Sequence, residues 1–418
     1  MASPPYADHV EDMANLDLTL PPPNDAQPCR PHQAIESPNM VRITVSLHLE
    51  LDELEAEWRA LDENSRNSLH QSFDWCVAWS RTHTHRFVVI RGACGQKPMF
   101  ILPFAVERGL VRTARLIGSE HSNLNTGVFA DLEPVPRVEL VRALTDGMRQ
   151  LRPFADVVRL ERMPAKWRGV LNPFSALPGI THPNASFQLP LLHGMEATLT
   201  QLNAKRRRKK IRTSEKRLAE MGGYDYITAR QSPQAHALLE TFFQQKASRF
   251  AALGLPDVFS DAATRAFFHA LVDRQTGGLF ELDAIGLKGE YQGKIIAISG
   301  LLRKGDHVIC QFGSIDDGVA ADSSPGELLF YRTIERLCGE GVKLFDFGIG
   351  DQRYKRSWCT IKTSLRDIVV PLTPRGFLAA SLYRAMTRAK RTVKANERAY
   401  AFLQRQRRRW QQGPGAED

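Results

Sequence analysis

Hydrophobic and polar residues alternate along the first half of the chain with two different periods. The runs VRITVSLHLE (41–50) and RFVVIRGACGQKPMFILPFAV (86–106) have the period of strands, and the second contains a Gly/Pro turn typical of a hairpin. Residues 51–61 and 136–151 instead place apolar side chains at helical spacing. Helices and strands that alternate up to about residue 190 predict an α/β domain.

A second set of elements begins near residue 194. The pattern predicts a basic helix (196–223) and a second helix (232–252). Three strands (279–289, 294–304 and 307–316), a third helix (324–341) and a last strand (343–348) follow. The second and third strands are joined by Gly305-Asp306, a pair suited to a tight hairpin turn. Because a helix separates them, the last two strands are expected to run parallel, so the predicted fold is a mixed-sheet α/β (α+β) fold.

The two ends of the chain differ from the middle in composition. Residues 1–40 hold eight of the 24 prolines and few aromatic residues, which predicts a disordered tail. Residues 376–418 combine many basic residues with one apolar stripe, which predicts one or two amphipathic cationic helices. The stripe consists of Leu378, Leu382, Met386, Ala389, Val393, Tyr400, Leu403 and Trp410. The expected segments are a tail (1–40), a first domain (41–193), a second domain (194–375) and a basic helical tail (376–418).

The net charge of +10 is concentrated in two segments. Residues 205–217 hold nine basic residues and one acid, and residues 384–409 hold ten and one, so the rest of the chain is net acidic. The overall charge is therefore no argument for nucleic-acid binding. The basic helix at 205–217 is interpreted either as a solvated face or as a surface for an anionic substrate, a lipid surface or RNA. No aromatic residues interleave with its charges, so nucleic acid is not an expected partner.

The chain lacks the sequence signatures of secreted, membrane-spanning and metal-binding proteins. No apolar run reaches the roughly 18–20 residues that cross a bilayer, and the first residues include acids rather than an apolar signal region. Six cysteines are scattered without C-x-x-C spacing, which favours reduced thiols over a zinc site or a disulfide framework. We therefore expect a cytoplasmic protein with no metal and no bound cofactor.

The segment from Asp322 to Leu329 begins a helix and has two competing interpretations. Ser324 at the N-cap, Pro325 at the first helical position and Glu327 at the third match a capping box. Alternatively, Gly326 and its neighbours expose backbone N–H groups, which at the start of a helix bind phosphate. A Glu327 carboxylate folded onto the cap would repel a phosphate, so both cannot hold together.

The segment KLFDFGIGDQRYKRSW (343–358) places polar side chains at the end of an apolar strand. Asp346 is interpreted either as half of a salt bridge or as a general base with a pKa raised by burial. Tyr354 and Lys355 begin the next helix, where a lysine can hold an oxyanion or a phosphate and a tyrosine can protonate a leaving group. This set suits acyl transfer by direct attack of a bound amine or hydroxyl.

Four stretches of the chain resemble a known acyltransferase family. They are KRRRKKIRTSEKRL, QFGSID, SPGELLFYRTIE and FDFGIGDQRYKRSW, of which the last is the most specific. The resemblance is to the GNAT-superfamily domain of proteins for cellulose and exopolysaccharide biosynthesis (the CelD type) and, more distantly, to the Fem-type peptidoglycan aminoacyltransferases. QSFDWCVAWSRTH and ILPFAV look like the family's first domain, so the resemblance covers about residues 45–370. It implies two GNAT-like halves in tandem, with the acyl donor on the second.

The resemblance also implies where the donor binds. In GNAT proteins the pantetheine arm lies between two parallel strands that part, which here are 307–315 and 343–348. The segment 321–328 takes the place of the pyrophosphate loop but has only Gly326 where the family's loop has more glycines. Acyl-CoA as co-substrate and aminoacyl-tRNA, the donor of Fem-type enzymes, both remain open. The residues expected to bind the donor are Gln311, Gly313, Ser323, Ser324 and Gly326.

The remaining roles come from the residue patterns above together with this resemblance. Asp346 or Asp351 is expected as base, Tyr354 as acid or positioning group and Lys355 as oxyanion or phosphate partner. The residues expected to bind the acceptor are Arg206, Arg207, Lys210 and Trp358. The expected activity is transfer from acyl-CoA to an amine, or a hydroxyl, of a small molecule or glycan precursor in polysaccharide or cell-envelope biosynthesis. The alternatives are tRNA-dependent aminoacyl transfer and a non-catalytic protein that binds RNA or, through its C-terminal basic helix, a membrane surface.

Overall fold

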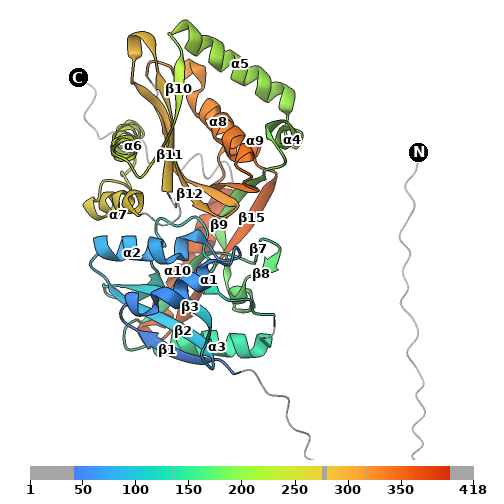
Figure 1. The fold of residues 1–418 in the computed structure, drawn as a ribbon. Coiled ribbons are helices and arrows are strands. Elements are labelled where there is room, and N and C mark those ends of the chain that lie inside the picture. Colours follow the sequence, from blue (N-terminus) through green and yellow to red (C-terminus); the bar gives the residue numbers. More distant parts are fainter. Residues whose placement is uncertain (1–41, 134, 275–279, 317, 396–418) are drawn as a thin grey trace, which may run out of the picture. The chain divides into compact units, whose positions relative to one another are not determined.

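The chain uses one order of strands and helices twice (Figure 1). The computed structural model describes residues 42–133, 135–274, 280–316 and 318–395. In the first half, four strands pair antiparallel in sequence order and a further strand pairs parallel to the fourth. These strands are β1 (Thr44–His48), β2 (Arg86–Cys94), β3 (Lys97–Glu107), β4 (Thr113–Leu116) and β6 (Val157–Pro164). The short β5 (Val128–Phe129) pairs with β3.

The second half repeats this plan. Its four antiparallel strands and one parallel strand are β10 (Tyr224–Arg230), β11 (Phe280–Leu287), β12 (Ile295–Lys304), β13 (His307–Ile315) and β14 (Leu344–Ile349). Two helices follow the first strand of each half and one precedes the parallel strand. In the first half these are α1 (Glu55–Asp62), α2 (Phe73–Thr82) and α3 (Arg137–Gln150), and in the second α6 (Pro233–Ala252), α7 (Ala262–Asp273) and α8 (Pro325–Gly339).

The two halves exchange their last strands. β9 (Ile180–Pro190) follows the first half in sequence but pairs antiparallel with β14 of the second half. β15 (Ile361–Pro371) follows the second half but pairs antiparallel with β6 of the first. β9 and β15 also pair with each other, so a single sheet runs through both halves in the order β1-β2-β3-β4-β6-β15-β9-β14-β13-β12-β11-β10. The predicted boundary at 193/194 therefore lies between segments that share one sheet.

Helices cover both faces of this sheet because side chains alternate along its strands. Val89 and Ile101 belong to a core shared with α1, α2, α6 and α7, whereas Val88 and Ile90 pack with α3 on the opposite face. In the second half that opposite face is covered by α5 (Ala204–Glu220) and α8. Figure 1 shows α2, α6 and α7 on one side of the sheet and α5 and α8 on the other.

The smaller elements are helices and short strands around this frame. They are α4 (Met195–Leu199), α9 (Arg353–Trp358), α10 (Pro374–Ala395), β7 (Lys166–Trp167), β8 (Val170–Leu171) and the 3-10 turns Asp52–Leu54, Leu69–Gln71, Pro173–Ala176, Gly289–Tyr291 and Ala321–Ser323. Within the described ranges, no helix is long and apolar enough to cross a membrane.

The predicted fold class is confirmed, including the hairpin at Gly305-Asp306 and the parallel pairing of β13 with β14. The pattern did not reveal α7, β9, β10 or β15 as elements. The predicted tail 1–40 lies outside the described residues, as does the part of the predicted C-terminal tail beyond Ala395.

Candidate active site

The parallel strands β13 and β14 separate after three residue pairs. His307, Val308 and Ile309 face Leu344, Phe345 and Asp346, and beyond that point β13 continues to Ile315 against β12 alone. The predicted gap between these strands is therefore present. Beyond the third pair, the backbone N–H and C=O groups of β13 and β14 no longer form the hydrogen bonds that join the two strands at their start.

Gly348 marks the end of regular pairing on β14. Its φ of 73° lies in the left-handed region, and a Cβ there would lie 2.8 Å from the Asn123 amide oxygen. The next residue donates its N–H to the same oxygen at 3.2 Å. A side chain larger than glycine would disturb both the turn and this contact between the two halves.

A cavity of about 600 Å³ lies beside the parted strands. Gly313, Ser324, Gly326 and Tyr354, four of the predicted site residues, line it. Lys246 and Arg249 on α6 line it as well, and burial lowers the pKa of the Lys246 ammonium group. These two cations were not among the predicted site residues, although their spacing of three residues on a helix places them on one face.

The start of α8 differs from a capping box. Ser324 is the N-cap, but its φ of 52° is left-handed and its side chain makes no capping hydrogen bond. Glu327, which also lines the cavity, does not bond back to the cap but accepts a hydrogen bond from Arg207 Nη1 at 2.9 Å. The capping-box interpretation is therefore wrong, because the ion pair with α5 outcompetes the local cap, and the Glu327 carboxylate does not fold onto the helix start.

Few backbone donors remain at this helix start. Pro325 has no N–H, and the N–H groups of Glu327 and Leu328 both donate to the Ser324 carbonyl. Gly326, which lines the cavity, thus supplies the first-turn N–H that has no intrahelical acceptor.

Lys355 and Tyr354 occupy different environments on α9. Lys355 is 5% exposed and donates from Nζ to the Ile349 carbonyl of β14 at 2.7 Å. Burial lowers the pKa of Lys355, while Cys310 of β13 and Asp346 of β14 act in the opposite direction. The Tyr354 ring stacks on Phe330 while the residue stays 36% exposed, and its partial burial raises its pKa above the ordinary value. The tyrosine therefore stays protonated at neutral pH.

Asp346 is fully buried, and both of its carboxylate oxygens accept hydrogen bonds from neighbouring groups. It accepts hydrogen bonds from Ser186 Oγ at 3.1 Å, Gln188 Nε2 at 3.0 Å and Gly348 N at 2.7 Å. Burial by itself would raise the pKa of Asp346, but His307, whose Nε2 lies 3.8 Å away, and these donors lower it. The expected raised pKa is therefore wrong, and the carboxylate fixes β9 and the Gly348 turn.

Several other predicted residues lie away from the cavity. The Gln311 side chain reaches the first half, where its Oε1 lies 2.9 Å from His70 Nε2 and 3.3 Å from Asn123 Nδ2. Ser323 is buried and donates to the Ala320 carbonyl. Asp351 is at the surface in an ion pair with Arg356.

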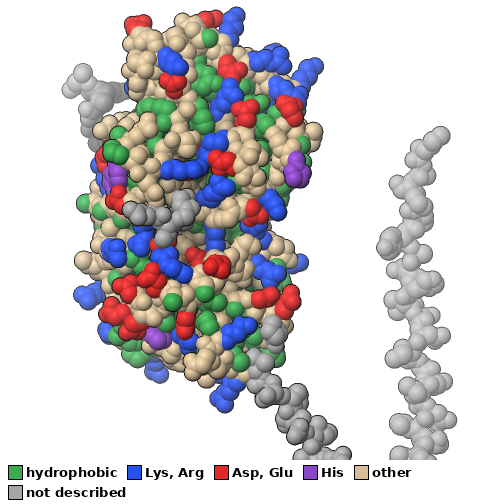
Figure 2. All heavy atoms as spheres, viewed as in Figure 1, with side chains coloured by type: hydrophobic (Ala, Val, Ile, Leu, Met, Phe, Trp, Pro, Cys, Tyr) green, Lys and Arg blue, Asp and Glu red, His purple; other side chains and the backbone are tan. Residues whose placement is uncertain are grey.

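The basic helix α5 has one inward and one outward face. The Arg207 guanidinium lies 3.4 Å from the centre of the Trp358 ring and donates to the Ser357 carbonyl, so both side chains belong to the protein interior. Lys210 pairs with Glu327 at 3.4 Å, whereas Arg206 is exposed. Figure 2 shows basic side chains over α5, where Lys205, Lys209, Arg212, Lys216 and Arg217 line a shallow surface hollow.

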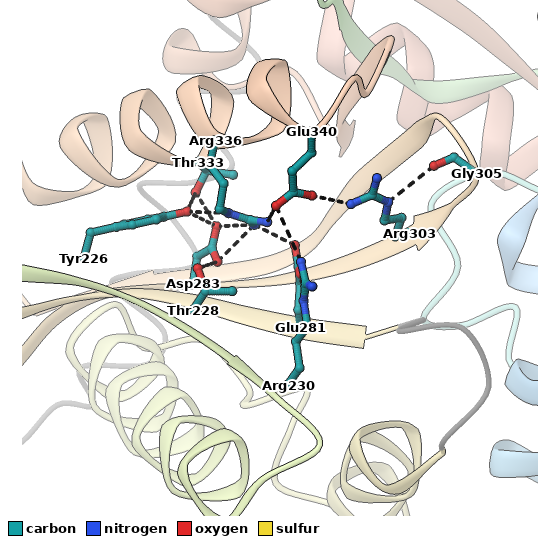
Figure 3. Close-up of polar contacts among 10 residues, drawn as sticks. All are labelled: Tyr226, Thr228, Arg230, Glu281, Asp283, Arg303, Gly305, Thr333, Arg336 and Glu340. Atoms are coloured by element: carbon teal, nitrogen blue, oxygen red, sulfur yellow. Dashed lines mark hydrogen bonds and ion pairs between the residues drawn. The ribbon is translucent and has the colours of Figure 1, made fainter.

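A buried polar network fixes α8 against the sheet (Figure 3). Asp283 on β11 accepts hydrogen bonds from Tyr226, Thr228, Thr333 and Arg336. Arg336 also donates to Glu281 at 2.6 Å. Since Thr333 and Arg336 lie on α8, this network sets the position of the helix whose first turn lines the cavity.

Residues 205–356 match the protein family described as an acetyltransferase (GNAT) domain. The fold is of the GNAT type. FemX is similar with a TM-score of 0.56 and 13% identity, over 81% of this chain and 100% of its own. L-PGS from Bacillus licheniformis has a TM-score of 0.50 and 10% identity, over 81% of this chain and 97% of its own. At these identities the likeness shows the fold alone.

A conserved protein of unknown function from Bacteroides thetaiotaomicron VPI-5482 is similar to the same degree, with a TM-score of 0.50 and 12% identity over 78% of this chain and 99% of its own. No curated protein matches this chain. The narrower resemblance to the exopolysaccharide-biosynthesis type remains a prediction.

Proposed function

We propose that this protein transfers an acyl group from acyl-CoA to an amine, or a hydroxyl, of a sugar- or phosphate-bearing acceptor. The observation that carries this proposal is the separation of β13 from β14 beside the cavity at the start of α8. A pantetheine arm is narrow and carries amides, so it fits between two strand edges whose N–H and C=O groups no longer bond to each other.

The donor's phosphates would lie at the start of α8. Gly326 offers an N–H there, the positive end of the helix dipole favours an anion, and Lys246 and Arg249 line the same cavity. Charge-assisted hydrogen bonds to a pyrophosphate would favour the charged form of Lys246, whose pKa burial lowers.

Tyr354 and Lys355 of α9 have different roles in the proposed reaction. The acceptor nitrogen attacks the thioester carbonyl carbon, a C–N bond forms and the C–S bond breaks. Lys355 stabilises the oxyanion, and Tyr354 protonates the leaving thiolate and regains a proton from the acceptor amine. The products are an amide and free coenzyme A. Asp346 is a positioning residue here because its carboxylate is buried and its pKa is lowered.

The acceptor side is inferred from charge. α5 passes next to the start of α8, since both Arg207 and Lys210 pair with Glu327. Its outer face carries basic side chains that suit an acceptor with phosphate or carboxylate groups. We propose precursors of polysaccharides or of the cell envelope as the class of acceptor.

One observation favours a second donor. With Pro325 at the first helical position and two N–H groups taken by Ser324, the loop offers fewer backbone donors than a glycine-rich pyrophosphate loop. Transfer of an aminoacyl group from tRNA, as in Fem-type enzymes, would use the same Tyr354 and Lys355 but need no such loop.

Calorimetric titration with coenzyme A tests the donor site. The wild-type protein is expected to bind it, and Lys246→Gln is expected to weaken binding by about tenfold through loss of a charged hydrogen bond. Lys97→Gln, an exposed lysine on the β2–β3 hairpin, is the matched control and should bind like the wild type. Absence of coenzyme A binding combined with turnover of aminoacyl-tRNA would transfer the assignment to the second donor. If neither donor binds, the acyltransferase proposal is wrong.

A further inference from the structure

Helix α10 packs on the sheet through one narrow face. Gly376, Ala380 and Thr387 are buried there, and a Cβ at Gly376 would clash with the Asp156 carbonyl oxygen. The Tyr383 hydroxyl lies 2.9 Å from both Glu161 Oε1 and Asp367 Oδ2 and shares its one hydrogen between these two acceptors. These contacts fix the rotation of the helix about its own axis, and so decide which side chains point outward.

The opposite face of α10 is apolar and exposed. Phe377, Leu378, Leu382 and Met386 are between 50% and 77% exposed, and Leu378, Leu382 and Met386 follow each other at four-residue spacing on one side of the helix. Exposed Ala385 and Ala389 extend the same stripe. Leu378, Leu382, Met386 and Ala389 belong to the stripe seen in the sequence, but it faces away from the protein body instead of packing on it.

Basic side chains border this stripe on both sides. Lys390 lies beside one edge and Arg388 beside the other, while Arg375 is in line with the stripe at its N-terminal end, and all three are exposed. The sequence from 374 to 395 contains six basic residues and no acid. An apolar stripe between two cationic edges is the pattern of helices that lie in the interface of an anionic bilayer.

We propose that α10 docks this protein on an anionic lipid surface, with the apolar stripe among the acyl chains and the basic edges at the headgroups. Charge complementarity favours this occupant over a second copy of the chain, because two α10 helices face to face would bring like charges together. The inference does not rest on the acyltransferase proposal.

Flotation of the full chain with vesicles tests the proposal. Binding is expected to vesicles of phosphatidylcholine with about 30% phosphatidylglycerol and to fall steeply between roughly 0.1 and 1 M salt. The triple variant Leu378→Ser/Leu382→Ser/Met386→Ser should bind at least about tenfold more weakly. Leu110→Ser/Val138→Ser, which changes two highly exposed apolar residues of the first half, is the matched control and should bind like the wild type.

Since all the substituted side chains are exposed, the thermal transitions of the variants are expected to match that of the wild type, which keeps the comparison valid. Equal binding by the triple variant and the wild type would overturn the proposal, because the lipid contact would then lie elsewhere. A wild-type dimer that the triple variant dissociates, without vesicle binding, would also overturn it and assign the stripe to self-association. Because coenzyme A titration reports on a different site, its failure would leave this result intact.

Discussion

Lys355 carries an amino group into the protein next to β14. Its Nζ bonds to a β14 carbonyl, and burial lowers its pKa. Burying a lysine that has no carboxylate hydrogen-bond partner in the described structure lowers stability. Its presence is therefore better explained by a role in catalysis.

Lys355→Met is expected to reduce kcat of acyl transfer by about 100-fold, because the oxyanion loses its charged partner, while coenzyme A binding is retained. The melting temperature should stay the same or rise, since a charge is no longer buried. Steady-state kinetics, titration and calorimetry measure these effects. Lys362→Met is the control, because Lys362 is exposed, and equal rates for both variants would remove Lys355 from the mechanism.

A second prediction at the scale of single residues concerns buried His70 and the stability of the protein at acid pH. Burial lowers its pKa to about 4, while an unfolded chain has the ordinary value of about 6.5. Between these values the unfolded state binds more protons, so the free energy of unfolding falls as the pH drops from 6.5 to 4, by about 3 kcal/mol for this group. Denaturant titrations of the wild type and His70→Gln across this range should show a shallower pH dependence in the variant. Parallel slopes would contradict the expectation.

At the scale of elements, α8 is held by the network around Asp283. Asp283→Asn would remove one of the three carboxylates that pair with Arg336 and put an NH₂ group where a buried oxygen accepts hydrogen bonds, so the free energy of unfolding is expected to fall by about 3 kcal/mol. Asp225→Asn on the neighbouring strand removes only a surface pair with Lys288 and should cost under about 1 kcal/mol. Chemical denaturation measures both, and similar losses would show that the network does not stabilise the helix.

At the scale of the whole molecule, the exchanged strands make each half depend on the other. A fragment of residues 41–193 would lack β15, so β6 would have an open edge and β9 would have no partner. We expect this fragment alone to aggregate and to show no cooperative thermal transition, and co-expression with 194–418 to restore one. A soluble fragment with a cooperative transition would instead show that the predicted domains are independent.

The sequence by itself determined the local elements and the class of the fold. Alternation, helical spacing and turn residues identify the β11–β12–β13 meander, α8 and β14, because these depend on neighbours along the chain. The family resemblance predicted Gly313, Ser324 and Gly326 as donor-binding residues, and the residue pattern predicted Tyr354 as a catalytic residue. All four line the cavity beside the parted strands.

Only the tertiary structure decided the rest, because it depends on partners distant in sequence. No local feature of the sequence indicates that β9 and β15 exchange halves. The same holds for the ion pair of Glu327 with Arg207 and for the contact of Gln311 with His70. The lowered pKa of Asp346 likewise comes from His307, Gln188 and a backbone N–H brought together by folding. The direction in which the α10 stripe faces was fixed by the packing of Ala380 and Thr387, which the amphipathic pattern does not contain.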